Sequence, residues 1–178
     1  QAAPVAMGER CLFPGAGKLF ASYGPGVPRM QEFALPSDQA EEARWRQVLP
    51  VDSTNVVAVT ESGQVLQIRQ QTNPRSHLGE VSRIDLGAAV DVEGDSGDGR
   101  LVIADAERRV RVLDAATLDS RAERQFESAI TSRVWIVESN VFVETADGTC
   151  HCLDADNDLN TKWDAGLDLN GDSLADRP

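Results

Sequence analysis

A short motif that recurs at a fixed distance constrains the fold of this chain more than any other feature. Leu113-Asp114-Ala115 returns as Leu153-Asp154-Ala155, a shift of 40 residues from position 113 to position 153. Each copy ends an alternating run, RRVRVLDA in the first case and TCHCLDA in the second. Such alternation is typical of a β-strand with one buried face. A repeat of about this length predicts several copies of one small strand-based unit.

Each unit is organised around a turn that joins two short apolar strands. The turn anchors are Gly17, Gly63, Arg108 and Gly148, so that successive units begin 46, 45 and 40 residues apart. The preceding strands are 11–13, 56–60, 101–105 and 141–145. We expect antiparallel sheets of up to four strands, in blade-like units at about 8–36, 45–87, 88–128 and 129–165, with an acidic tail at 166–178. The alternative is a β-sandwich with strands that are similar by chance, but the Leu-Asp-Ala copies lie in register with the strand pairs and favour a repeat.

The stretch from Asp147 to Trp163, DGTCHCLDADNDLNTKW, resembles the repeat of quinoprotein-type (PQQ-like repeat) β-propellers. Shared features are a hairpin turn with glycine, a strand ending in Leu-Asp-Ala, a polar turn and a later tryptophan. The resemblance covers most of residues 8–163. It implies an all-β chain of β-propeller blades, each an antiparallel four-stranded sheet. About four blades, a partial or half propeller, would form one domain over residues 1–178.

The wider family includes alcohol dehydrogenases that use pyrroloquinoline quinone and outer-membrane assembly lipoproteins that act as interaction scaffolds. The enzymes stack the quinone on an aromatic residue beside calcium and a catalytic carboxylate, and the sequence shows no such cluster. The resemblance therefore implies the fold without the redox chemistry. We expect a non-catalytic scaffold, with no catalytic or cofactor-binding residues, that binds protein or cell-envelope partners.

Two other functions are kept as alternatives. One is a fragment of a quinoprotein-like propeller enzyme whose active-site blades lie outside the chain, and the other is a calcium-stabilised extracellular adhesion module. In each case four blades would leave two blade faces open, with apolar surface and strand edges exposed. We expect a homodimer that completes the propeller, or further chain, to cover them.

The net charge restricts the class of partner, and the N-terminal residues bear on the cellular location. The formal net charge of −12 repels phosphate backbones, so we expect no nucleic-acid partner. No run of about 18 apolar residues occurs, which predicts no membrane span. The opening QAAPV fits either the start of a mature secreted protein or the boundary of a piece. The first interpretation predicts a periplasmic or extracellular location.

The C-terminal carboxylates form the one candidate metal site. Oxygen side chains stand at loop positions 1, 3, 5 and 9, and position 7 would supply a backbone carbonyl; these residues are Asp168, Asn170, Asp172, Asp176 and Leu174. Calcium prefers six to eight such hard oxygen ligands. The string resembles FG-GAP and dockerin-type calcium loops, although Ser173 replaces the usual glycine and the chain stops before position 12. Ca2+ is therefore the cofactor that the sequence predicts at this loop, and a frayed acidic terminus is the alternative. Residues 91–96 begin with a similar pattern of acidic side chains.

Two further patterns carry weaker functional hypotheses. Gly94-Asp95-Ser96-Gly97 echoes the nucleophile string of serine proteases, but its Gly/Asp density favours a turn. Cys150-His151-Cys152 could suggest zinc, but strand alternation places His151 on the opposite face from both cysteines. We expect Cys11, Cys150 and Cys152 to be small buried residues, since pairing Cys11 with either of the others would need the first and last blades to meet.

Two structural expectations complete the sequence analysis. A capping box and good helix formers favour a short helix near 38–49, whereas the alternative has 44–49 extended with Trp45 as the closing tryptophan of the repeat. Six residues on the repeated strands should be largely buried: Val65, Ile103, Val112, Leu113, Phe142 and Val143.

Overall fold

The computed structural model describes residues 2–15, 18–23, 31–35, 44–73 and 75–166. Over these residues the chain forms strands and turns and contains no helix. The strands make four antiparallel sheets of four strands each, and within each sheet the spatial order follows the chain order. The expected all-β fold class is thus confirmed, as are 56–60, 101–105 and 141–145 as second strands of their sheets.

The four sheets use consecutive segments of the chain. The first consists of β1 (Val5–Met7), β2 (Arg10–Gly15), β3 (Lys18–Tyr23) and β4 (Gln31–Ala34). The second consists of β5 (Trp45–Pro50), β6 (Asn55–Thr60), β7 (Gln64–Gln71) and β8 (His77–Asp85). The third consists of β9 (Asp95–Gly97), β10 (Arg100–Ala104), β11 (Arg109–Asp114) and β12 (Ser120–Gln125). The fourth consists of β13 (Trp135–Val137), β14 (Asn140–Glu144), β15 (Thr149–Asp154) and β16 (Asn160–Gly166).

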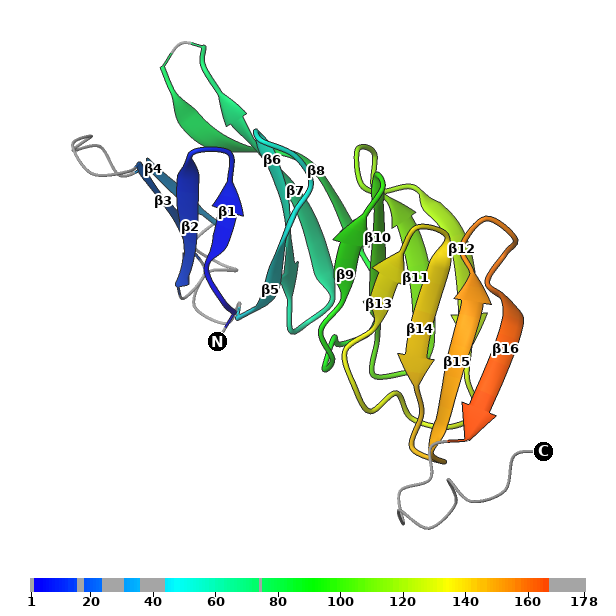
Figure 1. Cartoon of the computed structure of the whole chain (residues 1–178). Helices are drawn as coiled ribbons and strands as arrows, with labels where there is room; N and C mark the ends of the chain where they lie inside the picture. The colour runs from blue at the N-terminus through cyan, green and yellow to red at the C-terminus, as the bar shows by residue number, and fades with distance from the viewer. Residues whose placement is uncertain (1, 16–17, 24–30, 36–43, 74, 167–178) are drawn as a thin grey trace.

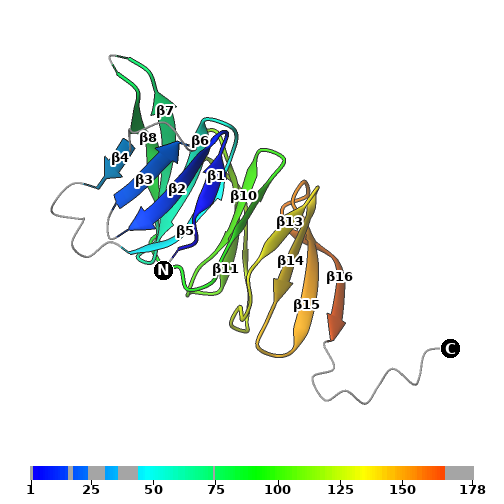
Figure 2. The same cartoon turned by 60° about the vertical axis from the view of Figure 1, so that its left-hand side comes forward.

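The sheets follow one another as separate layers, which the views in Figures 1 and 2 both show. The first strand of each sheet contacts the first strand of the next, since β1 meets β5, β5 meets β9, and β9 meets β13. An apolar cluster fills the space between each pair of neighbouring sheets. Full burial of one valine or leucine contributes roughly 1.5–3 kcal/mol, so packing between the sheets provides the main stabilisation.

The hairpin anchors adopt a backbone conformation that the turn requires. The φ angles of Gly63, Arg108 and Gly148 are 94°, 68° and 79°, in the left-handed region. At Gly63 the demand is also steric, because a Cβ atom would lie 2.0 Å from the carbonyl oxygen of Ala88, in the connection between β8 and β9. Glycine meets both requirements without strain, and Arg108 is the exception among these three anchors.

The Leu-Asp-Ala motif ends a strand, and its first and last residues pack in the core. Leu113 and Leu153 are buried, as are the alanines two residues later. The Asp114 carboxylate accepts hydrogen bonds from the backbone of Ala116 and Thr117. Asp154 accepts one from Asp156 in the same way. The aspartate closes the turn while its neighbours fill the core, which explains why all three residues recur together.

A β-bulge recurs between the third and fourth strands. The register shifts at Gln67/Ile68 in the second sheet, at Val112/Leu113 in the third and at Cys152/Leu153 in the fourth. These sites are 45 and 40 residues apart, as are the hairpin anchors. Bulges increase local twist, and here they twist the outer strands of the second, third and fourth sheets at the same point.

Two expectations need correction. The helix expected near 38–49 is wrong over Trp45–Leu49, which lies in β5, while 36–43 lies outside the described residues. Packing overrides helix propensity because Trp45 is buried and its Nε1 donates to the Lys18 carbonyl at 2.9 Å. Phe142 is half-buried rather than buried, and the other five expected core residues are buried as expected.

Candidate functional site

Within the described part of the chain, no sheet covers one face of the fourth sheet, whereas the next sheet covers the equivalent face of each earlier one. In the third sheet this face carries Val102, Ala104, Val110 and Val112, which pack against the fourth sheet. Forty residues later the same positions are occupied by Phe142, Glu144, Cys150 and Cys152. Figure 1 looks onto this face, with β13–β16 in front of β9–β12. We call it the open face of the fourth sheet.

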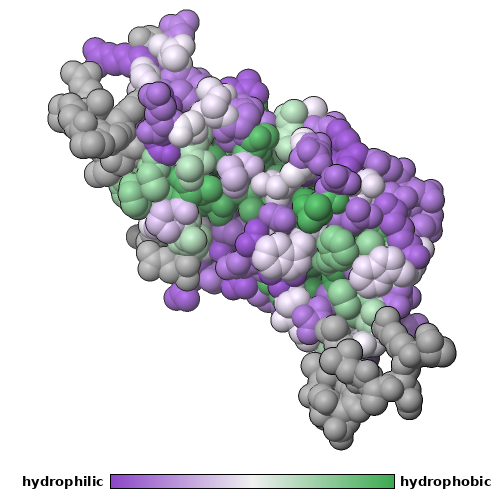
Figure 3. All heavy atoms as spheres, in the orientation of Figure 1, coloured by the Kyte–Doolittle hydropathy of each residue, from purple (hydrophilic) through white to green (hydrophobic). Residues whose placement is uncertain are grey.

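Aromatic side chains dominate the open face. Trp135 and Trp163 are each 47% exposed, and Val137 is 56% exposed. The rings of Phe142 and Trp163 lie with centroids 6.2 Å apart at a tilt of 53°. In the same orientation, Figure 3 shows green and pale residues on this part of the surface, rimmed by purple hydrophilic ones. A cluster of large apolar side chains with a polar rim is typical of a protein interaction site.

The Arg133 side chain borders the aromatic cluster. The Arg133 guanidinium lies 4.3 Å from the ring centroid of Trp135, a cation–π contact. The same side chain forms an ion pair with Asp95, with Arg133 Nη2 and Asp95 Oδ1 2.9 Å apart. Asp95 also accepts a hydrogen bond from the backbone of Ile136. Trp135 is thus held in position before any partner arrives.

The thiols of Cys150 and Cys152, on the same face as the aromatic rings, have low reactivity. Burial raises the pKa of Cys150, and the nearby Glu144 carboxylate raises it further. Burial also raises the pKa of Cys152, although the Lys162 ammonium opposes this. Both groups therefore remain thiols at neutral pH, and thiols are poor nucleophiles and poor metal ligands. All three cysteines are free; Cys152 is buried as expected, whereas Cys11 and Cys150 are only half-buried, which corrects the expectation for these two. The described residues contain no cluster of three or more metal-ligating side chains.

His151 lies on the opposite face from the two cysteines, as alternation predicts. Its Nδ1 is 2.7 Å from Asp164 Oδ1 and its Nε2 is 3.1 Å from Thr145 Oγ1. The contacts from Thr145 through His151 to Asp164 have the order of a catalytic hydroxyl–imidazole–carboxylate triad. However, Thr145 is only 2% exposed and its hydroxyl donates to Asp147 Oδ1 at 2.7 Å. The hydroxyl proton is directed away from the imidazole, so the arrangement ties strands together instead of activating a nucleophile.

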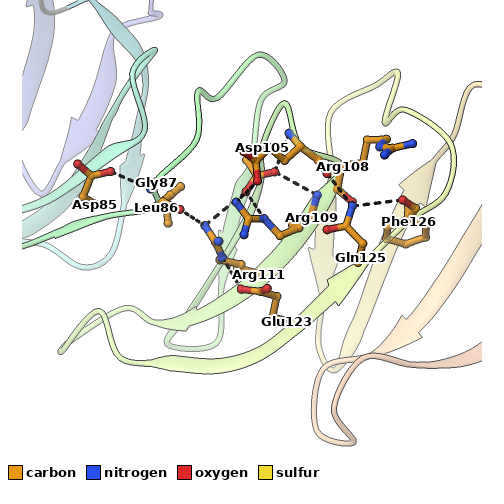
Figure 4. A network of polar contacts seen from close by, with 11 residues as sticks. Asp85, Leu86, Gly87, Asp105, Arg108, Arg109, Arg111, Glu123, Gln125 and Phe126 are labelled. Atoms are coloured by element: carbon orange, nitrogen blue, oxygen red, sulfur yellow. Dashed lines mark hydrogen bonds and ion pairs between the residues drawn. The ribbon is translucent and has the colours of Figure 1, made fainter.

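The third sheet carries the equivalent network with other residues (Figure 4). Asp105, at the position of Thr145, pairs with Arg109 and Arg111 at 3.1 Å and 3.4 Å. Arg111, at the position of His151, also pairs with Glu123 on β12 and donates to the Leu86 carbonyl of the preceding sheet. Because the same positions recur with different chemistry, we interpret this network as structural.

A polar cavity of about 280 Å³ lies at the inner strands β5 and β9. Its lining includes Arg46, Gln47, Glu93, Asp95, Ser96 and Arg133. The Gly94-Asp95-Ser96-Gly97 string lies here, where Gly94 N donates to Gln47 Oε1 at 2.6 Å and Ser96 donates to the Pro50 carbonyl. A Cβ atom at Gly94 would lie 2.2 Å from the Val102 carbonyl oxygen, so close backbone packing explains the glycine.

The candidate calcium residues Asp168, Asn170, Asp172, Leu174 and Asp176 lie outside the described residues, so that site stays a prediction. In the similar segment 91–96, Asp95 is already neutralised by Arg133. The sequence predicted an exposed apolar face at each end of the four blades, but the aromatic residues on this one were not identified. The signal was available at Phe142, which the 40-residue shift aligns with the buried Val102.

The comparisons with known proteins identify the arrangement of sheets. Neither the scan against family models nor the search of curated proteins gave a match. Solved structures do match: BamB from Moraxella catarrhalis superimposes with a TM-score of 0.70 at 11% identity over 92% of this chain. This protein is a partial β-propeller. Each sheet is therefore a blade, and the first strands lie at the inner edge.

Two further propellers give the same result. AztD from Citrobacter koseri matches with a TM-score of 0.69 at 8% identity, and BBS1N, solved in complex with ARL6DN, with 0.69 at 16% identity. Each match covers 94% of this chain. The chain spans about half the length of the three structures, 47%, 47% and 52%. At these identities the likeness concerns the fold alone.

Proposed function

We propose that this chain is a non-catalytic propeller scaffold that docks protein partners through the open face of its fourth blade. The observation that carries the proposal is the exposed aromatic cluster of Trp135, Phe142 and Trp163. Tryptophan and other aromatic residues are enriched at binding hot spots because they bury large areas at low entropic cost. The equivalent faces of the second and third blades are each covered by the next sheet, so the open face has the shape that accepts a sheet.

The electrostatics favour a protein over a nucleic acid as the partner. A formal net charge of −12 opposes approach to a phosphate backbone, while the open face itself is largely apolar. No helix in the described part of the chain has the length and hydropathy of a membrane span. The partner class includes a second copy of the chain that completes the propeller.

The finer parts of the proposal rest on the sequence resemblance. We assign the repeats to the quinoprotein type because the Leu-Asp-Ala copies and the later tryptophan match that pattern. A periplasmic or extracellular location follows from the same resemblance, since family members include envelope lipoproteins. BBS1N provides a precedent of another kind, as a propeller-like structure solved with a protein bound.

Site-specific photocrosslinking tests the proposal in the native host. A photoreactive amino acid replaces Val137, which is exposed on the open face, or Ala116, which is exposed at a turn of the third blade. We expect a discrete protein adduct from position 137 and none from position 116. Mass spectrometry of the adduct identifies the partner. Equal adducts from both positions, or none from either, would refute docking through the open face.

A further inference from the structure

The first blade also has a face that no other described residue covers. It carries Cys11, Phe13 and Phe20, with Phe13 and Phe20 paired across β2 and β3. Phe13 is 43% exposed and Phe20 is half-buried. The Phe20 ring lies over Gly15, where a Cβ atom would approach it to 3.1 Å. A partly exposed aromatic pair at the end of a stack of sheets is typical of a surface that binds a partner.

The strand register shows whether this face corresponds to the side of a blade that packs on the preceding blade or on the next one. Phe13 and Phe20 correspond to Ala58 and Leu66, because each is a cross-strand pair of the second and third strands on the side of its sheet that faces away from the next blade. Ala58 and Leu66 are the residues with which the second blade covers the first. Ile103 and Val143 do the same for the third and fourth blades. The face of Phe13 and Phe20 is therefore of the type with which a blade packs on the blade before it. We call this type a covering face, and we call the face on which the next blade packs a covered face.

The two ends of the chain thus present complementary faces. Every interface within the chain joins a covered face of one blade to a covering face of the next. Among the residues that the structure describes, none packs on the covering face of the first blade or on the covered face of the fourth. An interface between these two would continue the pattern of the three interfaces already present, whereas two copies of the fourth blade could not join in this way.

Lys18 lies on the face of Phe13 and Phe20, at the turn end of β3, where it forms an ion pair with Glu32 at 2.8 Å. Glu144 lies on the open face of the fourth blade, at the turn end of β14. Since the turn ends of neighbouring blades lie on the same side of the stack, the Lys18–Glu32 pair of one chain would face Glu144 of the other. The pairing of the two faces therefore rests on their apolar side chains and on the order of the blades, and not on opposite net charge.

We propose, on the basis of the function proposed above, that the partner is a second copy of this chain, docked head-to-tail at both ends to close a ring of eight blades. The chain matches about half the length of each of the three propellers, so two copies supply as many blades as one such propeller. A head-to-tail contact either closes or continues into a filament. Closure after two copies follows because the blades already stack as they do in half of a propeller.

Sedimentation of the purified chain and of two single variants tests this inference. Phe13→Asp places a charge on the covering face, and Trp163→Asp places one on the covered face. We expect the parent chain at twice the 19.2 kDa of one copy, and each variant as a monomer at the same concentration, with dissociation at least about tenfold easier. Val81→Asp, at an equally exposed position of the outer strand β8, is the matched control and should stay dimeric.

Mixing the two variants gives the decisive result. A Phe13→Asp chain keeps an intact fourth blade and a Trp163→Asp chain keeps an intact first blade, so one sound interface can form and dimers should return. Recovery also shows that both variants are folded. A monomeric parent chain, a Phe13→Asp variant that remains dimeric, or a mixture that remains monomeric would each overturn the inference. A parent chain that forms species larger than a dimer would overturn ring closure. If the parent is monomeric but position 137 crosslinks to a different protein, the scaffold function stands and only the identity of the partner is wrong.

Discussion

Asp105 Oδ2 lies 3.1 Å from Arg109 Nε, four residues along the same hairpin, and the Asp105 side chain is only 1% exposed. The carboxylate also accepts hydrogen bonds from the backbone of Glu107 and Arg109. One buried side chain therefore closes the turn and neutralises two arginines. The corresponding residues Thr60 and Thr145 are neutral but buried in the same way, so the position requires a polar side chain that bonds to the turn more than it requires a charge.

Replacing Asp105 with alanine should destabilise the third blade. The change leaves Arg109 and Arg111 without their shared carboxylate and the turn without its acceptor. We expect a loss of roughly 3 kcal/mol in the free energy of unfolding, near the lower end for breaking a buried ion pair, measured by urea denaturation. Glu107→Ala, which removes an exposed partner of Arg109, should cost less than about 1 kcal/mol. Equal losses from both variants would contradict the assigned role of Asp105.

Val143 tests the packing between the third and fourth blades. Its side chain is buried in the cluster that also contains Val102 and Val112. Truncation to alanine should lower the free energy of unfolding by about 1–3 kcal/mol, through lost burial and a residual cavity. Val81→Ala, at an exposed position, should change it by less than about 0.5 kcal/mol. An unchanged melting curve for Val143→Ala would show that the blade interface contributes little.

Acid should weaken the fold through the turn aspartates. The Thr145 hydroxyl lowers the pKa of Asp147 to about 2, and Arg121 together with the backbone of Ala116 lowers the pKa of Asp114. Since unfolded aspartates bind protons near pH 3.9, the unfolded chain takes up protons first as the pH falls. The stabilisation is therefore present above about pH 5 and is lost progressively toward pH 2. The urea midpoint should fall over that range.

A substitution at one turn checks that assignment. Asp147→Asn should lower stability at neutral pH and flatten the dependence between pH 5 and pH 2, because one depressed carboxylate is gone. Asp119→Asn, at an exposed position, is the control and should leave the slope as it is in the parent chain. Identical slopes in all three proteins would mean that Asp147 does not contribute.

The thiols of the fourth blade should react slowly with alkylating agents. Burial raises the pKa of both Cys150 and Cys152. In a Cys11→Ser background, the iodoacetamide rate of the folded chain should keep rising with pH beyond the point where the urea-unfolded chain, with ordinary values near 8.5, has levelled off. Matching pH profiles for the folded and unfolded chains would show that neither thiol is perturbed.

Calcium binding at 168–176 remains a sequence-based prediction that a melting experiment can check. If Asp168, Asn170, Asp172 and Asp176 bind Ca2+, millimolar calcium should raise the melting temperature by mass action. An Asp168→Ala, Asp172→Ala double variant should lose that response, and magnesium at the same concentration controls for screening. The same calcium response in the double variant and the parent would leave only a general salt effect.

The sequence alone determined the repeat, the hairpins and most of the core. Local chemistry decides these features: glycine or another residue with positive φ at the anchors, the aspartate turn after the third strand of the third and fourth sheets, and alternation that fixes which side of a strand is apolar. Hence Val65, Ile103 and Leu113 could be recognised as buried from their strands alone. The tertiary structure decided what covers each face. Phe142 carries the same pattern as Val102 but is half-exposed, because burial of a sheet face depends on the next blade and not on the strand that bears it. Trp45 illustrates the same rule, since its helix-forming neighbours yield to a strand once the tryptophan packs between the first two blades.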